Sequence, residues 1–291
     1  MFEELKTFIT VVELKNFTKA GLKLNLSQPT VSKHIKNLEQ YFKVILINRS
    51  IKQKNISITE DGHILYKRSK EILNLLDLTY MELNDHHTKV SGTIKIGASY
   101  TIGEYVLPKF LAIFLKKYPH INTEIHIDNT HNVCSSVSDF LFDIGLIEGS
   151  FYHTNLYKEY FYKDKMTLVT PYDLQIDSIN SLNNFNWIVR EKGSGTREYV
   201  DLFLSYNKIS PKNIMVLGSN YAVKEAVKNN LGITIISKLV VEQPHLNQEV
   251  NLYELDDSFI RNFSYITSKN TSNSYITNLF IEELKNYSLE L

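Results

Sequence analysis

The chain has 291 residues, which predicts two or three domains with separate hydrophobic cores. Basic and acidic side chains both number 32, yet residues 1–60 hold ten basic and five acidic ones, so a basic segment precedes an acidic remainder. This asymmetry predicts that only the first segment binds a polyanion. The single cysteine, Cys134, excludes a disulfide framework, a cysteine metal cluster and a two-cysteine redox switch, and no cofactor is expected.

The first sixteen residues, MFEELKTFITVVELKN, combine acidic side chains with an amphipathic pattern. A secretion signal would instead have a basic leader followed by an apolar centre. The sequence also lacks an apolar run of the length that crosses a bilayer. We therefore expect a cytoplasmic protein that has no membrane partner.

Three helices are predicted in chain order at the start of the sequence. The first has apolar residues at helical spacing from Phe2 to Val12. The second is expected to begin with Thr18 as its N-cap, and the third, in SQPTVSKHIK, has Ser27 as its N-cap and Pro29 in its first turn. The buried face of the third helix is expected to consist of Val31, Ile35 and Leu38.

After the third helix, VILINR and NISIT are two short β-rich runs that predict a hairpin wing with basic residues at its tip. A helix, a short turn and a second helix form the arrangement that enters the DNA major groove. Short hydroxyl and amide side chains suit phosphate oxygens and base edges, and lysines add charge. The alternative is an ordinary solvated helix face, which the neighbouring basic wing disfavours. The expected DNA contacts are Ser27, Gln28, Pro29, Thr30, Ser32, Lys33 and Lys36 on the helix, with Arg49 and Lys52 on the wing.

The run NFTKAGLKLNLSQPTVSKHIKNLEQYF, followed by INRS and ITEDG, resembles the winged helix-turn-helix of LysR-type transcriptional regulators. The likeness extends over nearly the whole chain. It implies double-stranded promoter DNA as a partner, control by a small molecule, assembly as a dimer of dimers, and RNA polymerase as a further candidate partner. Two departures are Gly21, where alanine is common, and Lys43, where glycine is usual. Gly21 is expected to weaken its helix by roughly 1 kcal/mol relative to alanine.

A long helix is predicted over residues 60–87, with Thr59 as its cap. Its apolar stripe consists of Leu65, Ile72, Leu76 and Leu83. At 1.5 Å per residue this helix is roughly 40 Å long, too long to bury its stripe against a small head. Pairing with a second copy of the chain is therefore favoured, and packing on the chain's own effector half is the alternative.

Strand-like and helix-like segments alternate over residues 93–291, which predicts an α/β architecture. The strand-like runs are TIKIGAS, INTEIHID, FDIGLIEG, YKDKMTLVT, NWIVRE, NIMVLG and GITIIS. This half resembles the two-lobed periplasmic-binding-protein fold that LysR-type regulators use to sense an effector. The expected domains are 1–59 for DNA binding, 60–91 for the linker helix and hinge, and 92–291 for effector binding. Within the last, lobe 1 comprises about 92–161 and 265–291, including a final helix, and lobe 2 about 162–264.

Two loops are the expected walls of an effector site. GASYTIGEY follows the first strand of the effector half and opens a helix, and REKGSGTREY follows NWIV. In the second loop Gly193 and Gly195 allow a tight turn in which several N–H groups converge before a helix N-terminus, a geometry that favours an anion. Hydroxyl groups of Ser194 and Thr196 would add hydrogen bonds.

The motif RExGSGTR, together with GLIEG, resembles LysR-type regulators of sulfur assimilation and autotrophic carbon fixation. That resemblance implies a small anionic metabolite as the effector. Arg197 adds positive charge or pairs with Glu148 or Glu198, and an unpaired Glu148 would repel an anion. The expected effector contacts are Ser99, Tyr100, Thr101, Glu148, Ser194, Gly195, Thr196 and Arg197.

The predicted function is a sequence-specific DNA-binding transcriptional regulator controlled by a small, anionic, sulfur-related metabolite between the two lobes. A solute-binding protein of a transport system is the alternative. It is disfavoured by the basic head and by first residues that do not have the pattern of a secretion signal. Enzymatic activity is not expected, because the sequence offers no assignable acid–base pair or activated nucleophile and no metal-ligand set.

Overall fold

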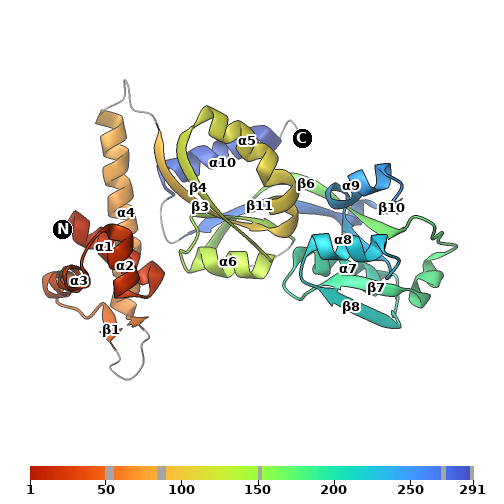
Figure 1. Cartoon of the computed structure of the whole chain (residues 1–291), viewed down its shortest axis with the longest axis horizontal. Helices are drawn as coiled ribbons and strands as arrows, with labels where there is room; N and C mark the ends of the chain where they lie inside the picture. The colour runs from red at the N-terminus through yellow and green to blue at the C-terminus, as the bar shows by residue number, and fades with distance from the viewer. Residues whose placement is uncertain (50–55, 84–89, 150–152, 270–272, 289–291) are drawn as a thin grey trace. The chain divides into compact units, whose positions relative to one another are not determined.

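The structure is a computed structural model that describes residues 1–49, 56–83, 90–149, 153–269 and 273–288. Contacts divide the chain into two compact units. The first unit comprises Met1–Thr88 with Asn270–Tyr275, and the second comprises Lys89–Lys269 with Ile276–Leu291. The first is mainly helical and the second is built on a mixed sheet, so the predicted α/β class is confirmed (Figure 1).

The first unit is a three-helix head followed by a hairpin and a long helix. Its elements are α1 (Phe2–Leu14), α2 (Phe17–Leu24), α3 (Gln28–Phe42), β1 (Ile47–Arg49), β2 (Ile56–Ile58) and α4 (Glu60–Leu83). Val31, Ile35 and Leu38 on α3 are fully buried, as predicted from their spacing. The strands β1 and β2 pair antiparallel and form the predicted wing. The predicted tip lies outside the described residues.

The helix caps follow local side-chain chemistry, with one correction. Ser27 accepts a hydrogen bond from the backbone N–H of Thr30 at 3.2 Å, and Thr59 accepts one from the N–H of Gly62 at 2.9 Å, as expected. The cap of α2 is Asn16, not Thr18, because Asn16 has an extended backbone and its side chain accepts from Lys19 N at 2.9 Å. The helix therefore begins earlier than predicted.

The two departures from the family pattern also take on a physical meaning. A Cβ at Gly21 would lie 2.6 Å from the carbonyl oxygen of Leu26, whose N–H donates to the carbonyl of Gly21 at 2.9 Å. Alanine does not fit there without a backbone shift, so the prediction that alanine at position 21 would stabilise this helix is wrong. Lys43 is the C-cap of α3 and has a left-handed φ of 57°, a conformation that glycine adopts at lower cost.

The second unit contains two lobes with separate cores. Lobe 1 is formed by β3 (Ser91–Ser99), η1 (Ile102–Val106), α5 (Leu107–Lys117), β4 (His120–Asp128), α6 (Thr130–Ser138), β5 (Ile144–Glu148) and α10 (Tyr275–Ser288). Helices α5 and α10 pack together through Phe110, Phe114 and Phe280, whose rings are fully buried. The last helix returns to lobe 1, as predicted.

Lobe 2 has its own core around Trp187 and Phe203. Its elements are η2 (Ile179–Asn184), β7 (Asn186–Arg190), α7 (Gly195–Tyr206), β8 (Asn213–Leu217), α8 (Asn220–Lys228), β9 (Thr234–Ser237), α9 (Lys238–Leu246), β10 (Val250–Glu254) and η3 (Asp257–Phe259). The strands β7 and β8 form a parallel pair, and Trp187 bridges to Ile233 just before β9. All seven strand-like runs of the sequence are strands in the structure.

Two long strands, β6 (Leu156–Pro171) and β11 (Ile260–Ser268), join the lobes. They pair antiparallel from Ile260 opposite Lys165 to Ser268 opposite Leu156, with a register shift between Phe263 and Ser264. The sheet order is β10-β6-β11-β5-β3-β4, with β9 also paired to β6. Both predicted lobe boundaries fall inside these shared strands, and the domain boundaries remain predictions.

Candidate functional site

The N-terminus of α3 carries a network of short polar side chains. Ser27 Oγ and Thr30 Oγ1 share a hydrogen bond of 2.7 Å, and Gln28 Nε2 donates to Ser32 Oγ at 3.0 Å. Ser27, Gln28 and Pro29 are exposed, whereas Thr30 and Ser32 are half-buried. These contacts hold hydroxyl and amide groups at the solvent-facing start of the helix, in the arrangement that a groove-reading helix requires.

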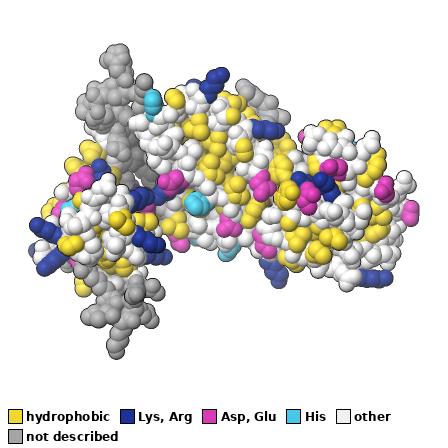
Figure 2. Space-filling model, viewed as in Figure 1, with side chains coloured by type: hydrophobic (Ala, Val, Ile, Leu, Met, Phe, Trp, Pro, Cys, Tyr) yellow, Lys and Arg dark blue, Asp and Glu magenta, His cyan; other side chains and the backbone are white. Residues whose placement is uncertain are grey.

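Basic side chains lie along the same helix. Lys33 and Lys36 are exposed, and neither makes an ion pair with another described residue. Lys and Arg side chains stand out from the surface of this unit (Figure 2). Asn37, in contrast, donates to Glu4 Oε1 of α1 at 2.7 Å and belongs to the head's internal packing. Arg49 lies in β1, with its side chain outside what the structure describes, and Lys52 is outside the described residues altogether.

Among its described side chains, helix α4 packs on the head in its first half. Leu65 is buried, and the hydroxyl of the buried Tyr66 donates to Glu13 Oε1 of α1 at 3.2 Å. Further along, Ile72 and Leu76 are 42% and 41% exposed. The remaining residue of the predicted stripe, Leu83, has a side chain that is not described. Half of the stripe is thus only partly covered within this unit.

In the second unit, predicted effector residues from both lobes meet at Arg261. Thr101 follows β3, Glu148 ends β5, and Thr196 lies in the first turn of α7. Arg261, on the shared strand β11, is fully buried. Its Nη2 donates to Thr101 Oγ1 at 2.9 Å and its Nη1 donates to Thr196 Oγ1 at 3.1 Å, while Nη1 lies 3.4 Å from Glu148 Oε1.

Asp164 on β6 is a further hydrogen-bond and ion-pair partner of Arg261. Its Oδ2 accepts from Arg261 Nε at 2.6 Å, and its Oδ1 accepts from Ser237 Oγ at 2.7 Å. Burial raises the pKa of the Asp164 carboxyl, while the charge of Arg261 and the hydrogen bond from Ser237 oppose that rise. A single guanidinium therefore faces two buried carboxylates, Glu148 and Asp164, from different strands.

A second buried arginine lies beside this cluster. Arg190, at the end of β7, donates from Nε and Nη2 to the two oxygens of Glu191, both at 2.8 Å. Its Nη1 donates to Asn220 Oδ1 at 2.7 Å, and Asn220 Nδ2 donates to Thr101 Oγ1 at 2.9 Å. The ring of Tyr100 lies 4.3 Å from the guanidinium carbon of Arg190. Asn220 thus connects the two arginine clusters.

The turn before α7 positions this helix against the end of β5. Ser194 is the N-cap of α7, and its Oγ accepts from Thr196 N at 3.2 Å. A Cβ at Gly195 would lie 2.4 Å from the carbonyl oxygen of Glu148, so glycine permits direct contact between the two backbones. Thr196 Oγ1 can then donate to Glu148 Oε1 at 3.3 Å. The expected tight turn therefore brings the two lobes together at Glu148.

Two predicted effector residues are arranged differently from the rest. The sequence analysis offered Glu148 or Glu198 as a partner for Arg197. In the structure Arg197 instead donates to Asp201 Oδ1 at 2.8 Å and to the carbonyl of Arg190 at 3.0 Å. One helical turn separates Arg197 from Asp201, which places them on the same helix face. Ser99 is buried at the end of β3, and its Oγ has no partner among the described residues.

Residues that the sequence analysis missed carry much of this site: Arg190, Asp164, Asn220 and Arg261. Arg190 occurs inside the quoted run NWIVRE, and a charged residue within a buried strand was the available signal. Arg261 likewise sits in the β-rich run IRNFSYITS.

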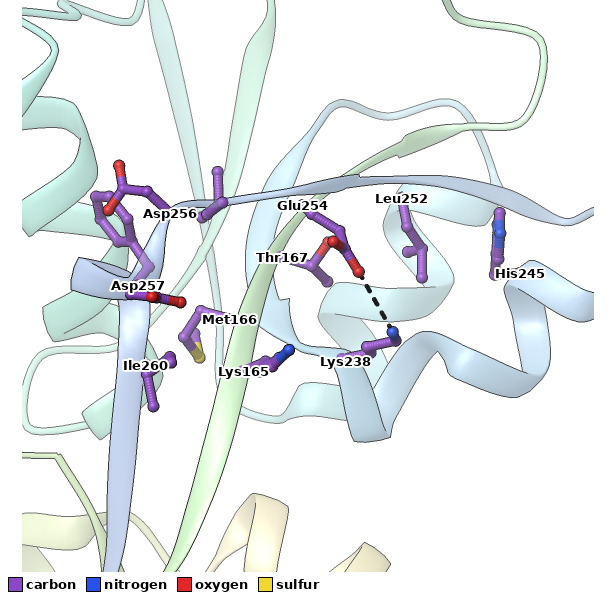
Figure 3. Close-up of a pocket in the computed structure, with 12 residues that line it drawn as sticks. Lys165, Met166, Thr167, Lys238, His245, Leu252, Glu254, Asp256, Asp257 and Ile260 are labelled. Atoms are coloured by element: carbon purple, nitrogen blue, oxygen red, sulfur yellow. Dashed lines mark ion pairs between the residues drawn. The ribbon is translucent and has the colours of Figure 1, made fainter.

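Three cavities lie elsewhere on the second unit, among the described residues. One of about 250 Å³ lies between β6, β10 and β11 and contains Lys165 and the Lys238–Glu254 ion pair (Figure 3). Another, of about 540 Å³, lies between Tyr105 and Lys109 of lobe 1 and helices α8 and α9. The third, of about 260 Å³, is lined in part by Cys134. None of the expected effector residues lines these cavities.

The buried Cys134 is not a reactive thiol in this arrangement. Burial raises its pKa to about 12, despite the nearby charge of Lys158. The thiolate, the reactive form of cysteine, is therefore scarce at neutral pH. No group of His, Cys, Asp or Glu that could hold a metal occurs in the described part of the chain. The described helices also include none long and apolar enough to span a membrane.

A winged helix-turn-helix head and a two-lobed sheet domain with a polar centre define a class, the DNA-binding regulators that respond to a small molecule. Comparison with known proteins agrees. Residues 2–63 match the family model "Bacterial regulatory helix-turn-helix protein, lysR family", and residues 87–288 match "LysR substrate binding domain".

The HTH-type transcriptional regulator CysL of Bacillus subtilis is 43% identical, over 100% of this chain and 99% of that protein. A probable RuBisCO transcriptional regulator of Phaeodactylum tricornutum is 31% identical, over 99% of this chain and 97% of that protein. A full-length OxyR variant from Pseudomonas aeruginosa has a TM-score of 0.77 at 18% identity, covering 100% of this chain and 95% of that chain. The chain belongs to the LysR family and is a DNA-binding transcriptional regulator with an effector-binding domain.

Proposed function

We propose that the start of α3 reads operator DNA while the wing holds the phosphate backbone. The groups assigned to base edges and nearby phosphates are Ser27, Gln28, Pro29, Thr30, Ser32 and Lys33. The groups assigned to backbone phosphates are Lys36, Arg49 and Lys52. Support comes from the exposed, hydrogen-bonded polar network of α3 and from the exposed charges of Lys33 and Lys36, which suit phosphate contacts.

The effector site is assigned to the cluster around Arg261. One observation carries this assignment: Thr101 and Glu148 of lobe 1 and Thr196 of lobe 2 share hydrogen bonds or an ion pair with the same guanidinium. A ligand that inserts among them changes contacts between the lobes. A few kcal/mol of differential affinity for two lobe arrangements is enough to switch promoter occupancy. The resemblance to sulfur and carbon-fixation regulators favours a small anionic, sulfur-related effector.

The chain is proposed to work as a homo-oligomer, a dimer of dimers. The exposed Ile72 and Leu76 of α4 offer one surface to a second copy. Strands β4 and β8 lie at sheet edges and expose a second set of apolar side chains, which are Ile125, Ile127, Ile214, Met215 and Val216. Unpaired apolar edges favour association with another chain. RNA polymerase is a further candidate partner.

We favour a protein that acts in the cytoplasm as a regulator and has no enzymatic activity. The family match over the head sets aside the solute-binding alternative. The charged groups around Arg261 are paired with one another rather than arranged as a nucleophile beside a base.

An effector titration tests this assignment. DNA binding by the full chain is followed by fluorescence anisotropy while sulfur-pathway and phosphorylated metabolites are added. Thr196→Val should raise the effector concentration needed for half of the response and leave effector-free DNA binding unchanged. Thr154→Val, an exposed threonine outside the cluster, is the matched control and should behave as the native chain does. An unaltered titration of Thr196→Val would remove this residue from the effector site.

A further inference from the structure

Glu148 has one carboxylate oxygen that lacks a partner. Its Oε1 is 3.4 Å from Arg261 Nη1 and 3.3 Å from Thr196 Oγ1, whereas the buried Oε2 has no hydrogen-bond partner among the described residues. The residue is only 1% exposed, so bulk water does not solvate this oxygen. Buried polar atoms without partners are rare in folded proteins, so this oxygen requires an explanation, and a bound ligand would supply one. Glu148 Oε2 is thus a ready acceptor inside the proposed effector site.

The charges around Glu148 do not balance. Arg261 is closer to Asp164, at 2.6 Å, than to Glu148, at 3.4 Å. The positive charge of Arg190 is taken up by both oxygens of Glu191. The cluster therefore contains two cations, Arg261 and Arg190, and three carboxylates. One additional positive charge would make its formal net charge zero. An added dianion would instead increase the excess of negative charge.

Thr101 supplies a hydrogen-bond donor at the same guanidinium that faces Glu148. Its Oγ1 accepts from Asn220 Nδ2 and from Arg261 Nη2, both at 2.9 Å. A hydroxyl has two acceptor sites and one hydrogen, so both acceptor sites are occupied and the hydrogen is available to donate. The site therefore presents an acceptor on Glu148 and a donor on Thr101, both linked to Arg261.

We infer that the effector carries an amine, as in a small amino-acid-like zwitterion, and that Glu148 selects for it. The ammonium group donates to Glu148 Oε2, and a carboxylate or carbonyl oxygen accepts from the hydroxyl of Thr101. This inference rests on the proposed function, since it concerns the same site, and it adds a second charged group to the anionic effector proposed there. A bare oxyanion would satisfy the Thr101 hydroxyl but leave Glu148 Oε2 without a donor.

Entry to the site requires the lobes to move, because Thr101, Glu148 and Thr196 are all buried. The strands β6 and β11 that join the lobes have a register shift between Phe263 and Ser264, where the ladder of hydrogen bonds is irregular. Such an irregularity is a natural place for two lobes to bend. Binding at Glu148 is thereby linked to the lobe arrangement.

Matched ligand pairs test the inference on the full chain by isothermal calorimetry. L-cysteine is compared with mercaptopropanoate and L-alanine with propanoate, pairs that differ in the amine, and sulfite and sulfate serve as anions without an amine. The member with the amine should bind at least about tenfold more tightly. Glu148→Gln should remove this preference, while Glu198→Gln, the same change on the first turn of α7 outside the Arg261 cluster, should retain it.

The outcomes separate the two proposals. Equal binding of the two members of a pair by the native chain overturns the inference, whatever Glu148→Gln does to folding. If sulfite or sulfate binds in a manner that depends on Thr196 and the amines do not bind, the proposed effector site stands and the amine inference falls. If amines bind but neither Glu148→Gln nor Thr196→Val weakens them, both the site and the inference are wrong. If no probe binds a chain that still binds DNA, the inference is wrong.

Discussion

Replacement of Arg261 by methionine would remove a cation that two buried carboxylates share. Methionine has a similar length, so little volume is lost, but Asp164 and Glu148 remain in a buried site without their guanidinium. Removing one partner of a buried ion pair costs roughly 3–5 kcal/mol. Lys238→Met is the matched control, since Lys238 forms an exposed ion pair with Glu254 in the same lobe, where such a pair contributes about 0–1 kcal/mol.

The deficit should depend on pH in a defined direction. Burial raises the pKa of Asp164 above its ordinary value of 3.8, and Arg261 limits that rise. A carboxyl whose pKa is raised by folding contributes stability that is complete below the unfolded pKa and is lost as pH rises through the folded pKa. Without Arg261 the folded pKa rises further. The variant should therefore lose more stability, relative to the native chain, as the pH increases from about 4 towards 7.

Urea unfolding followed by the fluorescence of Trp187 provides the assay. Trp187 is the single tryptophan and is fully buried in lobe 2, so its emission reports the unfolding of this lobe. The midpoint should fall for Arg261→Met with little change in slope, and the fall should be smaller in acid. A loss below about 1 kcal/mol that is also independent of pH would refute the shared-cation account.

Three further changes test the head and lobe 1. Lys33→Ala should weaken operator binding by roughly 1–3 kcal/mol and relax sequence preference if the side chain reads a base; if it contacts phosphate, binding to all sequences should weaken alike and the salt slope should fall by about one. Lys43→Gly should raise the thermal midpoint of the head by relieving a left-handed conformation that costs about 1 kcal/mol for residues other than glycine. Glu159, whose pKa is held at about 2 by hydrogen bonds from Lys285 and Tyr265, stabilises lobe 1 above its unfolded pKa, and this contribution is lost as pH falls towards 2. Glu159→Gln should thus lower the thermal midpoint at neutral pH and match the native chain near pH 2.

Each of these changes has a control of the same chemical kind. Lys212→Ala, an exposed lysine of lobe 2, should leave DNA binding intact, and unchanged affinity and salt slope in Lys33→Ala would remove Lys33 from the interface. Lys36→Gly lies inside α3 and should destabilise the head, so a destabilised Lys43→Gly would contradict the cap argument. Glu282→Gln on α10 should have no such pH dependence, and a Glu159→Gln deficit that persists in acid would contradict the assigned pKa.

Local patterns predicted the elements that local physics determines. Ser27 and Thr59 cap their helices as expected, and the apolar spacing on α3 identified its buried face. The cap of α2 was misplaced because two residues of suitable type, Asn16 and Thr18, stand close together. Backbone geometry, which periodicity does not reveal, decides between them. The Arg197–Asp201 pair, however, obeys the i, i+4 rule and was predictable.

The centre of the proposed effector site could not be predicted from such patterns, because it depends on contacts between distant parts of the chain. Arg261 meets Asp164 on the neighbouring strand and Thr101 from the other lobe. The strands β10 and β11 were absent from the predicted set, and without β11 no argument could place a guanidinium between the two predicted loops. The loops themselves were identified correctly as neighbours, since the ring of Tyr100 in the first lies 4.3 Å from the guanidinium carbon of Arg190 in the second.

Operator binding by the full chain tests the central claim most directly. Genomic fragments and shuffled duplexes of equal length and composition are titrated at moderate salt, with and without candidate metabolites. We predict that at least one fragment is bound far more tightly than its shuffled counterpart, and that a metabolite changes this ratio. Equal affinity for every fragment and its shuffled counterpart, under all of these conditions, would contradict a head that reads sequence under the control of a sensing domain.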